Sequence, residues 1–178
     1  MKILTLLRHA KSGWDDRITR DFDRGLNAKG RRAARTVGRE MRARGLVFDA
    51  VIASPAVRVA ETLRDVSEGY GRALDAACDI DLYLASPSVL LDRIHAAPDE
   101  ADRLLVVAHN PGLEQLALML TARDETGKVE ELAGKYPTAT VAELRFDVDC
   151  WADVKPGGGT LTRFFRPRDL DPELGPDE

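Results

Sequence analysis

Two histidines follow apolar segments in a way that would present both to the same ligand. His9 follows the run Ile3–Leu7 after a single arginine, and His109 follows directly on the run Leu104–Ala108. Both runs are almost unbroken, which is typical of strands buried on both faces of a parallel sheet. Because ligands bind at the carboxyl ends of the strands in such sheets, we expect both imidazoles at one edge.

Two arginines are predicted at the same edge. Arg8 precedes His9, and Arg58 lies one turn into a helix predicted to open at Ser54-Pro55. Two guanidinium groups, two imidazoles and helix N-termini suit a phosphoryl group, because arginine forks bind its oxygens and fixed cations stabilise charge during transfer. A histidine there can take the phosphoryl group on nitrogen and release it to water.

The prediction depends on the convergence of four residues. A single histidine or arginine at a strand end is more often structural than catalytic. The third histidine, His95, lies near the end of a predicted helix, where a cation suits the helix dipole, and it is interpreted as structural. The many arginines between residues 31 and 44 are interpreted as the solvated face of a helix.

Alternating strands and helices predict an α/β fold with helices on both faces of the sheet. The predicted strands are Ile3–Leu7, Val51–Ala53, Ile80–Leu84, Leu104–Ala108, Thr138–Phe146 and Cys150–Val154. The predicted helices are Asn27–Gly45 and three that open at Ser54-Pro55, Ser86-Pro87 and Asn110-Pro111. Arg123–Lys135 is predicted to be a loop, and Gly157-Gly158-Gly159 a turn.

Length and composition narrow the classes of protein. The 178 residues suit one domain, predicted over residues 1–170 and followed by an acidic tail at 171–178 that we expect to be frayed. A net charge of −4 argues against nucleic-acid binding, and no apolar stretch is long enough for a membrane span. Cys78 and Cys150 have no disulfide-like or metal-like spacing, so a cytoplasmic location is expected.

Four short motifs occur in a fixed order along the chain. They are LLRHAKSGW around His9, Asp23-Arg24-Gly25-Leu26 with Gly30, Ser54-Pro55 with Arg58 and Thr62, and AHNPGLEQL around His109. Together they resemble the motifs of the histidine phosphatase superfamily, with Ala10 in place of the glycine of its Arg-His-Gly signature. The short chain, the RHAKSGW form and the segment from Trp151 to Leu170 are most similar to the SixA-type phosphohistidine phosphatases.

The resemblance implies a fold and a set of roles. The fold would be phosphoglycerate-mutase-like, a three-layer α/β/α arrangement with a mostly parallel central sheet, in a minimal form without a large helical insert. His9 would be the nucleophile that forms a phosphohistidine intermediate, and Arg8, Arg58 and His109 would hold the phosphoryl oxygens. The resemblance implies no cofactor, and no residues here have metal-ligand spacing.

Two departures from the family pattern bear on the substrate. Asp15 stands where larger relatives carry a phosphate-contacting asparagine, and no insert supplies the usual glutamate acid, for which Asp81 is a weak positional match. Phosphohistidine has a readily protonated leaving group and depends less on a general acid than an alkyl phosphate does. Asp15 and Asp81 are therefore only candidates for a leaving-group or acid role.

The sequence accordingly predicts a metal-independent phosphatase that hydrolyses phosphohistidine on a signalling or phosphotransfer protein and releases inorganic phosphate. The alternative enzyme is a phosphatase of small phosphomonoesters. A non-catalytic module that binds phosphorylated ligands is less favoured, because Arg8, His9, Arg58 and His109 are all present. No nucleic-acid or membrane partner is expected.

Overall fold

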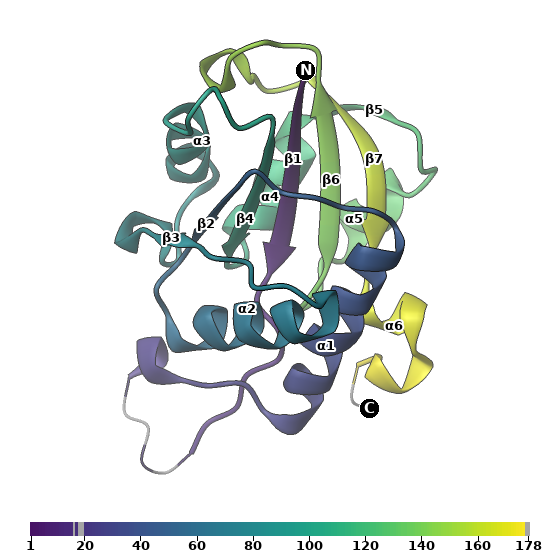
Figure 1. Cartoon of the computed structure of the whole chain (residues 1–178). Coiled ribbons are helices and arrows are strands. Elements are labelled where there is room, and N and C mark those ends of the chain that lie inside the picture. The colour runs from purple at the N-terminus through teal and green to yellow at the C-terminus, as the bar shows by residue number, and fades with distance from the viewer. Residues whose placement is uncertain (16, 18–19, 177–178) are drawn as a thin grey trace.

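A seven-stranded mixed sheet forms the middle layer of the computed structural model, which describes residues 1–15, 17 and 20–176 (Figure 1). The strands are β1 (Lys2–Arg8), β2 (Ala50–Ala53), β3 (Ala77–Cys78), β4 (Arg103–Ala108), β5 (Thr121–Asp124), β6 (Val141–Phe146) and β7 (Gly159–Phe165). Their order in the sheet is β3-β2-β4-β1-β6-β7-β5. Only β6 runs antiparallel to its neighbours, β1 and β7, so the sheet is mostly parallel, as predicted.

Helices cover both faces of this sheet. The helices are α1 (Ala28–Ala43), α2 (Val57–Tyr70), α3 (Pro87–His95), α4 (Gly112–Leu120), α5 (Val129–Gly134) and α6 (Pro167–Leu170). The first two pack on one face, and α3, α4 and α5 lie on the other (Figure 1). None of the helices in the described part of the chain is long and apolar enough to cross a membrane.

The two apolar cores explain why the runs within the central strands β1 and β4 are almost entirely apolar. In β4, Leu105 and Val107 belong to the core under α1 and α2, whereas Leu104 and Val106 belong to the core under α3 and α4. Alternate side chains of a strand point to opposite faces, so a strand with a core on each face needs no polar positions. The expected three-layer α/β/α fold is confirmed.

Helix starts follow the capping signals with small shifts. The side chain of Asn27 accepts a hydrogen bond from the backbone N–H of Gly30 at the start of α1, and Ser86 accepts one from Val89 at the start of α3. The helix predicted to open at Ser54-Pro55 begins two residues later, at Val57. The shift leaves the Ser54 hydroxyl available for a partner outside the helix.

Two predicted strands are short 3-10 turns instead. Within Ile80–Leu84 a 3-10 turn covers Ile80–Leu82, and only Leu82 is buried, while Ile80 and Leu84 are 62% and 55% exposed. Within Cys150–Val154 a 3-10 turn covers Trp151–Asp153, where the indole N–H of Trp151 donates to the carbonyl of Ala101 at 2.7 Å. In both segments a few inward-facing apolar side chains resembled a strand pattern.

The second half of the chain is more ordered than its polarity suggests. The predicted loop Arg123–Lys135 contains the end of β5 and all of α5, and a whole strand, β7, follows the predicted glycine turn. The acidic tail is not frayed as far as Pro176: a 3-10 turn covers Pro172–Leu174, and Leu174 is buried in the core beside α1. Residues 177–178 lie outside the described part of the tail.

Candidate active site

A cavity of about 380 Å³ opens at the carboxyl ends of the parallel strands β1, β2 and β4. The four residues singled out in the sequence all line it, together with side chains from the loops that follow the strands. The lining consists of Arg8, His9, Lys11, Ser12, Asp21, Arg24, Arg58, Leu84, His109, Asn110 and Thr138. The predicted edge therefore brings Arg8, His9, Arg58 and His109 together.

His9 is held as a neutral imidazole with one nitrogen available for attack. Its Nδ1 lies 2.8 Å from the carbonyl oxygen of Ala10, which can only accept, so Nδ1 carries the hydrogen. Nε2 is then unprotonated, and Arg58 Nε donates to it at 3.4 Å. Burial lowers the pKa of His9 from 6.5 to about 3, and the electrostatic effects of His109, Arg8 and Arg58 act in the same direction.

The loop after His9 is fixed by its contacts with α1 and α2. The backbone N–H of Ala10 donates to Thr62 Oγ1 at 2.9 Å, and that hydroxyl donates to the carbonyl of Arg58 at 2.6 Å. On the other side the loop touches Gly30 of α1, where a Cβ would overlap the carbonyl of Lys11. Glycine is needed at this position because the two backbones approach too closely for a side chain.

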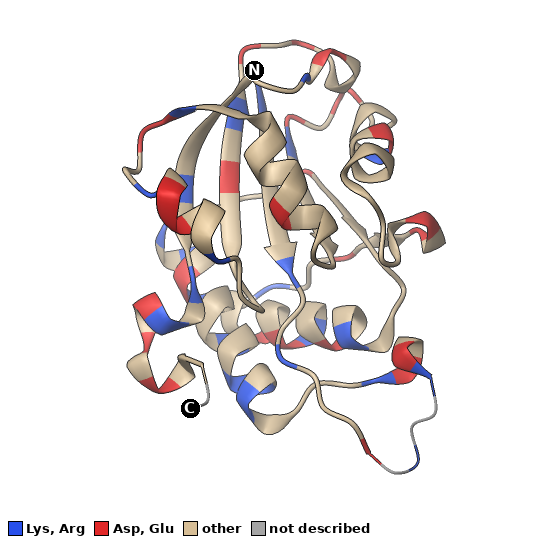
Figure 2. Ribbon diagram, turned by 180° about the vertical axis from the view of Figure 1, so that it is seen from behind, with Lys and Arg blue, Asp and Glu red and all other residues tan. Residues whose placement is uncertain are grey.

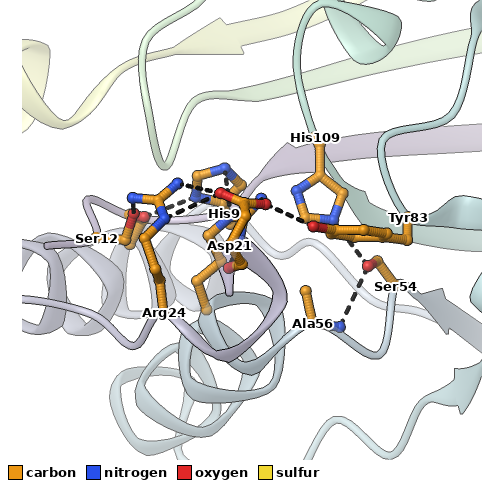
Figure 3. Close-up of polar contacts among 10 residues, drawn as sticks. His9, Ser12, Asp21, Arg24, Ser54, Ala56, Tyr83 and His109 are labelled. Atoms are coloured by element: carbon orange, nitrogen blue, oxygen red, sulfur yellow. Dashed lines mark hydrogen bonds and ion pairs between the residues drawn. The ribbon is translucent and has the colours of Figure 1, made fainter. Parts of the chain in front are cut away.

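His109 is oriented by Ser54, as Figure 3 shows. The Ser54 hydroxyl accepts from the backbone N–H of Ala56 at 3.3 Å and lies 2.7 Å from His109 Nε2. Burial lowers the pKa of His109 from 6.5 to about 4, so the ring is neutral, and the Ser54 hydroxyl can donate to Nε2 or accept from it. When the hydroxyl donates, the ring hydrogen is on Nδ1, which is buried without a partner among the described residues. A phosphoryl oxygen would satisfy this donor.

The two arginines are anchored in different ways. Arg8 Nη1 donates to the carbonyl of Tyr136 at 3.0 Å, and burial lowers the pKa of this guanidinium below its usual value. Arg58 is almost fully buried, and its two terminal nitrogens hold Asp21: Nη1 donates to the backbone carbonyl at 2.8 Å and Nη2 to the carboxylate at 2.9 Å. Both side chains are thereby preorganised beside His9.

Asp21 is a site residue that the sequence analysis missed. Figure 3 shows its carboxylate between Arg24 and Tyr83: Arg24 Nε donates to it at 3.0 Å and the Tyr83 hydroxyl at 2.6 Å. Burial raises the pKa of Asp21, but hydrogen bonds from Tyr83, Arg24 and Arg58 outweigh that effect and hold the pKa well below its usual range. The only signal in the sequence was its position two residues before the recognised Asp23-Arg24 motif.

Asp15 and Asp81 do not line the cavity. The exposed carboxylate of Asp15 accepts from Arg17 Nη2 at 2.8 Å, and Asp81 is paired with Arg93 on the surface. An acid or leaving-group role for either of them stays a prediction. His95 also lies outside the cavity, and its ring contacts the carbonyl of Val154 at 2.7 Å.

Comparisons with known proteins agree with this geometry. The family model described as the histidine phosphatase superfamily (branch 1) matches residues 4–82. An uncharacterized protein of Mycobacterium tuberculosis is 37% identical over 164 residues, which cover 91% of this chain and 100% of that protein. An uncharacterized chloroplastic protein of Arabidopsis thaliana is 30% identical over 92% of this chain and 77% of its own length.

Two solved structures extend the likeness to the fold. Both are provisionally assigned as the phosphohistidine phosphatase SixA, one from Nakamurella multipartitia and one from Agrobacterium tumefaciens, and each is 28% identical to this chain. Their TM-scores are 0.78 and 0.75; each covers 93% of this chain, and the matches span 96% and 98% of the two relatives. With its four motifs, its fold and relatives similar over nearly its whole length, this chain belongs to the histidine phosphatase superfamily.

Proposed function

We propose that this chain is a phosphatase that hydrolyses phosphohistidine on a protein, through a phosphohistidine intermediate on His9 and without a metal ion. The observation that carries the proposal is the state of His9: a neutral ring whose Nδ1 is held by a carbonyl and whose Nε2 lies 3.4 Å from Arg58 Nε, in a cavity that Arg8 also lines. Such a nitrogen is ready to attack phosphorus, because no proton has to leave it first.

In the first step the phosphoryl group moves from one imidazole to another. His9 Nε2 forms a bond to phosphorus as the substrate's nitrogen–phosphorus bond breaks, and the substrate imidazole, protonated on its other nitrogen, leaves as a neutral ring. His9 keeps its Nδ1 hydrogen on the Ala10 carbonyl and becomes a phosphorylated imidazolium. The bond made is of the same kind as the bond broken, so this step needs little help from a general acid.

In the second step water attacks the phosphorus of this intermediate. Its nitrogen–phosphorus bond breaks, His9 returns to the neutral form, and the protons of water pass to the inorganic phosphate and to solvent. Throughout, the guanidinium groups of Arg8 and Arg58 and the Nδ1 hydrogen of His109 would face the phosphoryl oxygens and stabilise their charge. Neither step of this proposed mechanism requires a metal ion.

The carboxylate of Asp21 supports an imidazole leaving group. It lies in the cavity beside Arg58, and its pKa is held well below the usual range, so it is ionised at neutral pH. A carboxylate there accepts the N–H of a protonated substrate ring but repels an additional anionic group. Likeness to the two SixA-assigned structures favours the same substrate class.

A substrate panel tests the proposal. We expect kcat/KM on a phosphohistidine-bearing phosphotransfer domain to exceed that on phosphoserine, sugar phosphates and glycerate phosphates by at least about tenfold, which is about 1.4 kcal/mol in transition-state stabilisation. His9→Ala in the same assay measures the background of spontaneous hydrolysis. A preference of similar size for any phosphomonoester would overturn the proposal in favour of a small-molecule phosphatase.

A further inference from the structure

A second cavity, of about 250 Å³, adjoins the active-site cavity. The two share Arg8, Lys11 and Thr138, so a single molecule can reach into both. The walls come from the start of α1, the segment before β6, α6 and the C-terminal segment that packs beside α1. The motif around His9 contributes Arg8 and Lys11 to this cavity, and the segment from Trp151 to Leu170 contributes Pro167 and Arg168, but the sequence predicts no role for Lys11 or Arg168.

The second cavity is strongly cationic although the chain as a whole carries a net charge of −4. Its basic lining residues are Arg8, Lys11, Lys29, Lys135 and Arg168. None of the described residues that line it carries a carboxylate. Figure 2 shows the corresponding basic segments at the carboxyl end of β1 and along the start of α1 beneath it. Five cations around one hollow attract an anion.

Two of these cations have buried donors without an acceptor. The Nε atoms of Arg8 and Arg168 are both buried and make no hydrogen bond with any described residue. The ammonium group of Lys135, on the exposed rim, has no side-chain partner within the described structure. Buried donors are paired in nearly all proteins, so these two unpaired Nε donors indicate that an acceptor is supplied by a ligand.

The remaining walls are apolar and come from the side chains Ala33, Pro137, Pro167, Leu174 and Pro176. A cavity with an apolar wall and a cationic rim matches a carboxylate on a short hydrocarbon stem, as in glutamate. A bare inorganic anion would leave the apolar wall uncovered.

We propose that this cavity is a carboxylate subsite that takes an acidic side chain of the substrate protein, close to its phosphorylated histidine. The inference rests on the proposed function, because it places the phosphohistidine at His9 and the acidic residue across Arg8. Arg8 would contact the phosphoryl group on one side and lie beside the carboxylate on the other. The subsite thus selects phosphohistidines that have an acidic neighbour.

Two phosphohistidine peptides that differ only in a flanking residue, glutamate or glutamine, test the subsite. We expect the parent enzyme to favour the glutamate peptide by about tenfold in kcat/KM, mostly through KM, since the carboxylate contributes to binding. In Lys135→Gln and Arg168→Gln this ratio should fall towards one. Lys155→Gln, an exposed lysine outside both cavities, is the matched control and should keep the parent's ratio.

A ratio near one in the parent, or an undiminished ratio in both cavity variants, would overturn the subsite. If neither peptide is hydrolysed, the proposed function fails. The carboxylate subsite is then tested separately, by measuring whether tetraglutamate inhibits the hydrolysis of p-nitrophenyl phosphate. Inhibition by tetraglutamate that weakens in Lys135→Gln but not in Lys155→Gln supports a carboxylate site, and no inhibition of the parent refutes it.

Discussion

At the scale of single residues, the site depends on where two hydrogen atoms are placed. A backbone carbonyl holds the Nδ1 hydrogen of His9, and the Ser54 hydroxyl occupies Nε2 of His109. In the proposed mechanism His9 presents a lone pair to the phosphoryl group, and His109 presents a hydrogen to it. The two histidines need opposite tautomers: the Ala10 carbonyl, which can only accept, fixes that of His9, and the Ser54 hydroxyl permits that of His109 by donating to its Nε2.

Replacing His9, the proposed nucleophile, should abolish turnover without unfolding the protein. We expect His9→Ala to lose activity entirely, because no other described side chain that lines the cavity is an imidazole hydrogen-bonded to Arg58. Rapid quenching of the parent with labelled substrate should trap an acid-labile phosphoenzyme, and the variant should trap none. Label recovered on another residue would contradict the assignment of His9.

Burial of neutral histidines should make the protein less stable in mild acid. The pKa of His9 is about 3 in the folded chain against 6.5 as its ordinary value, so between these pH values only the unfolded chain binds the proton. The unfolding free energy should therefore decrease as the pH is lowered from 6.5 towards 3, by up to about 1.4 kcal/mol per pH unit from this group. Urea unfolding at several pH values between about pH 6 and pH 4 should show a smaller decrease of the unfolding free energy in His9→Asn than in the parent. An equal fall in parent and variant would contradict the buried neutral state.

Asp15 and Asp21 are competing candidates for contact with the leaving group. Asp21→Asn should narrow the preference for phosphohistidine over phosphomonoesters by about tenfold, since it removes a carboxylate from the cavity. Asp15→Asn should leave that preference nearly unchanged, because this side chain is exposed and paired with Arg17. The measurement is the ratio of kcat/KM on phosphohistidine to kcat/KM on a phosphomonoester, for both variants. A larger change in Asp15→Asn than in Asp21→Asn would favour Asp15 as the residue that contacts the leaving group.

At the scale of elements, the strands and helices that carry Arg8, His9, Arg58 and His109 were predictable. The apolar runs of β1 and β4 are almost unbroken, and the Ser54-Pro55 signal stands just before the start of α2, so the local pattern and the tertiary structure agree. The 3-10 turn that carries Asp21 has no buried residue and no apolar periodicity, which left nothing for a pattern to detect. β7 was missed because its buried positions do not alternate regularly and a bulge interrupts its pairing with β6.

The packing of α1 against the loop after His9 should make Gly30 sensitive to substitution. In Gly30→Ala the new Cβ would overlap the carbonyl of Lys11, so the loop has to move and the unfolding free energy should fall by about 2 kcal/mol or more. Gly134→Ala, at the end of α5 with open space around the glycine, is the control and should stay within about 0.5 kcal/mol. Equal stability of the two variants in urea would refute the close approach.

At the scale of the whole molecule, the cavity at His9 gathers cations from segments far apart in the chain. Arg8 ends β1, Arg24 follows the turn Asp21–Asp23, and Arg58 lies in α2. Such an arrangement stabilises the charge of a phosphoryl group in transfer through fixed guanidinium groups, and it exists only when all three elements are in place.

Chelation should not affect catalysis, whereas a transition-state mimic should inhibit it. We expect full activity in excess chelator, and strong inhibition by vanadate, whose oxygens would occupy the positions of the phosphoryl oxygens. Arg58→Ala should lower kcat/KM by at least about a hundredfold and weaken vanadate inhibition in parallel, because a buried guanidinium is lost from the site. Activity that chelation abolishes and a divalent ion restores would refute the metal-free mechanism.

The central place of β1 in the sheet has a consequence for the order of events during synthesis. β1 pairs with β4 and β6, and the backbone N–H of His9 donates to Ala108, so the nucleophile is fixed by residues translated about a hundred positions later. Pairings between such distant segments form slowly and only after both have emerged from the ribosome. His9 can therefore take its position in the active-site cavity only after β4 and β6 have been made and have paired with β1.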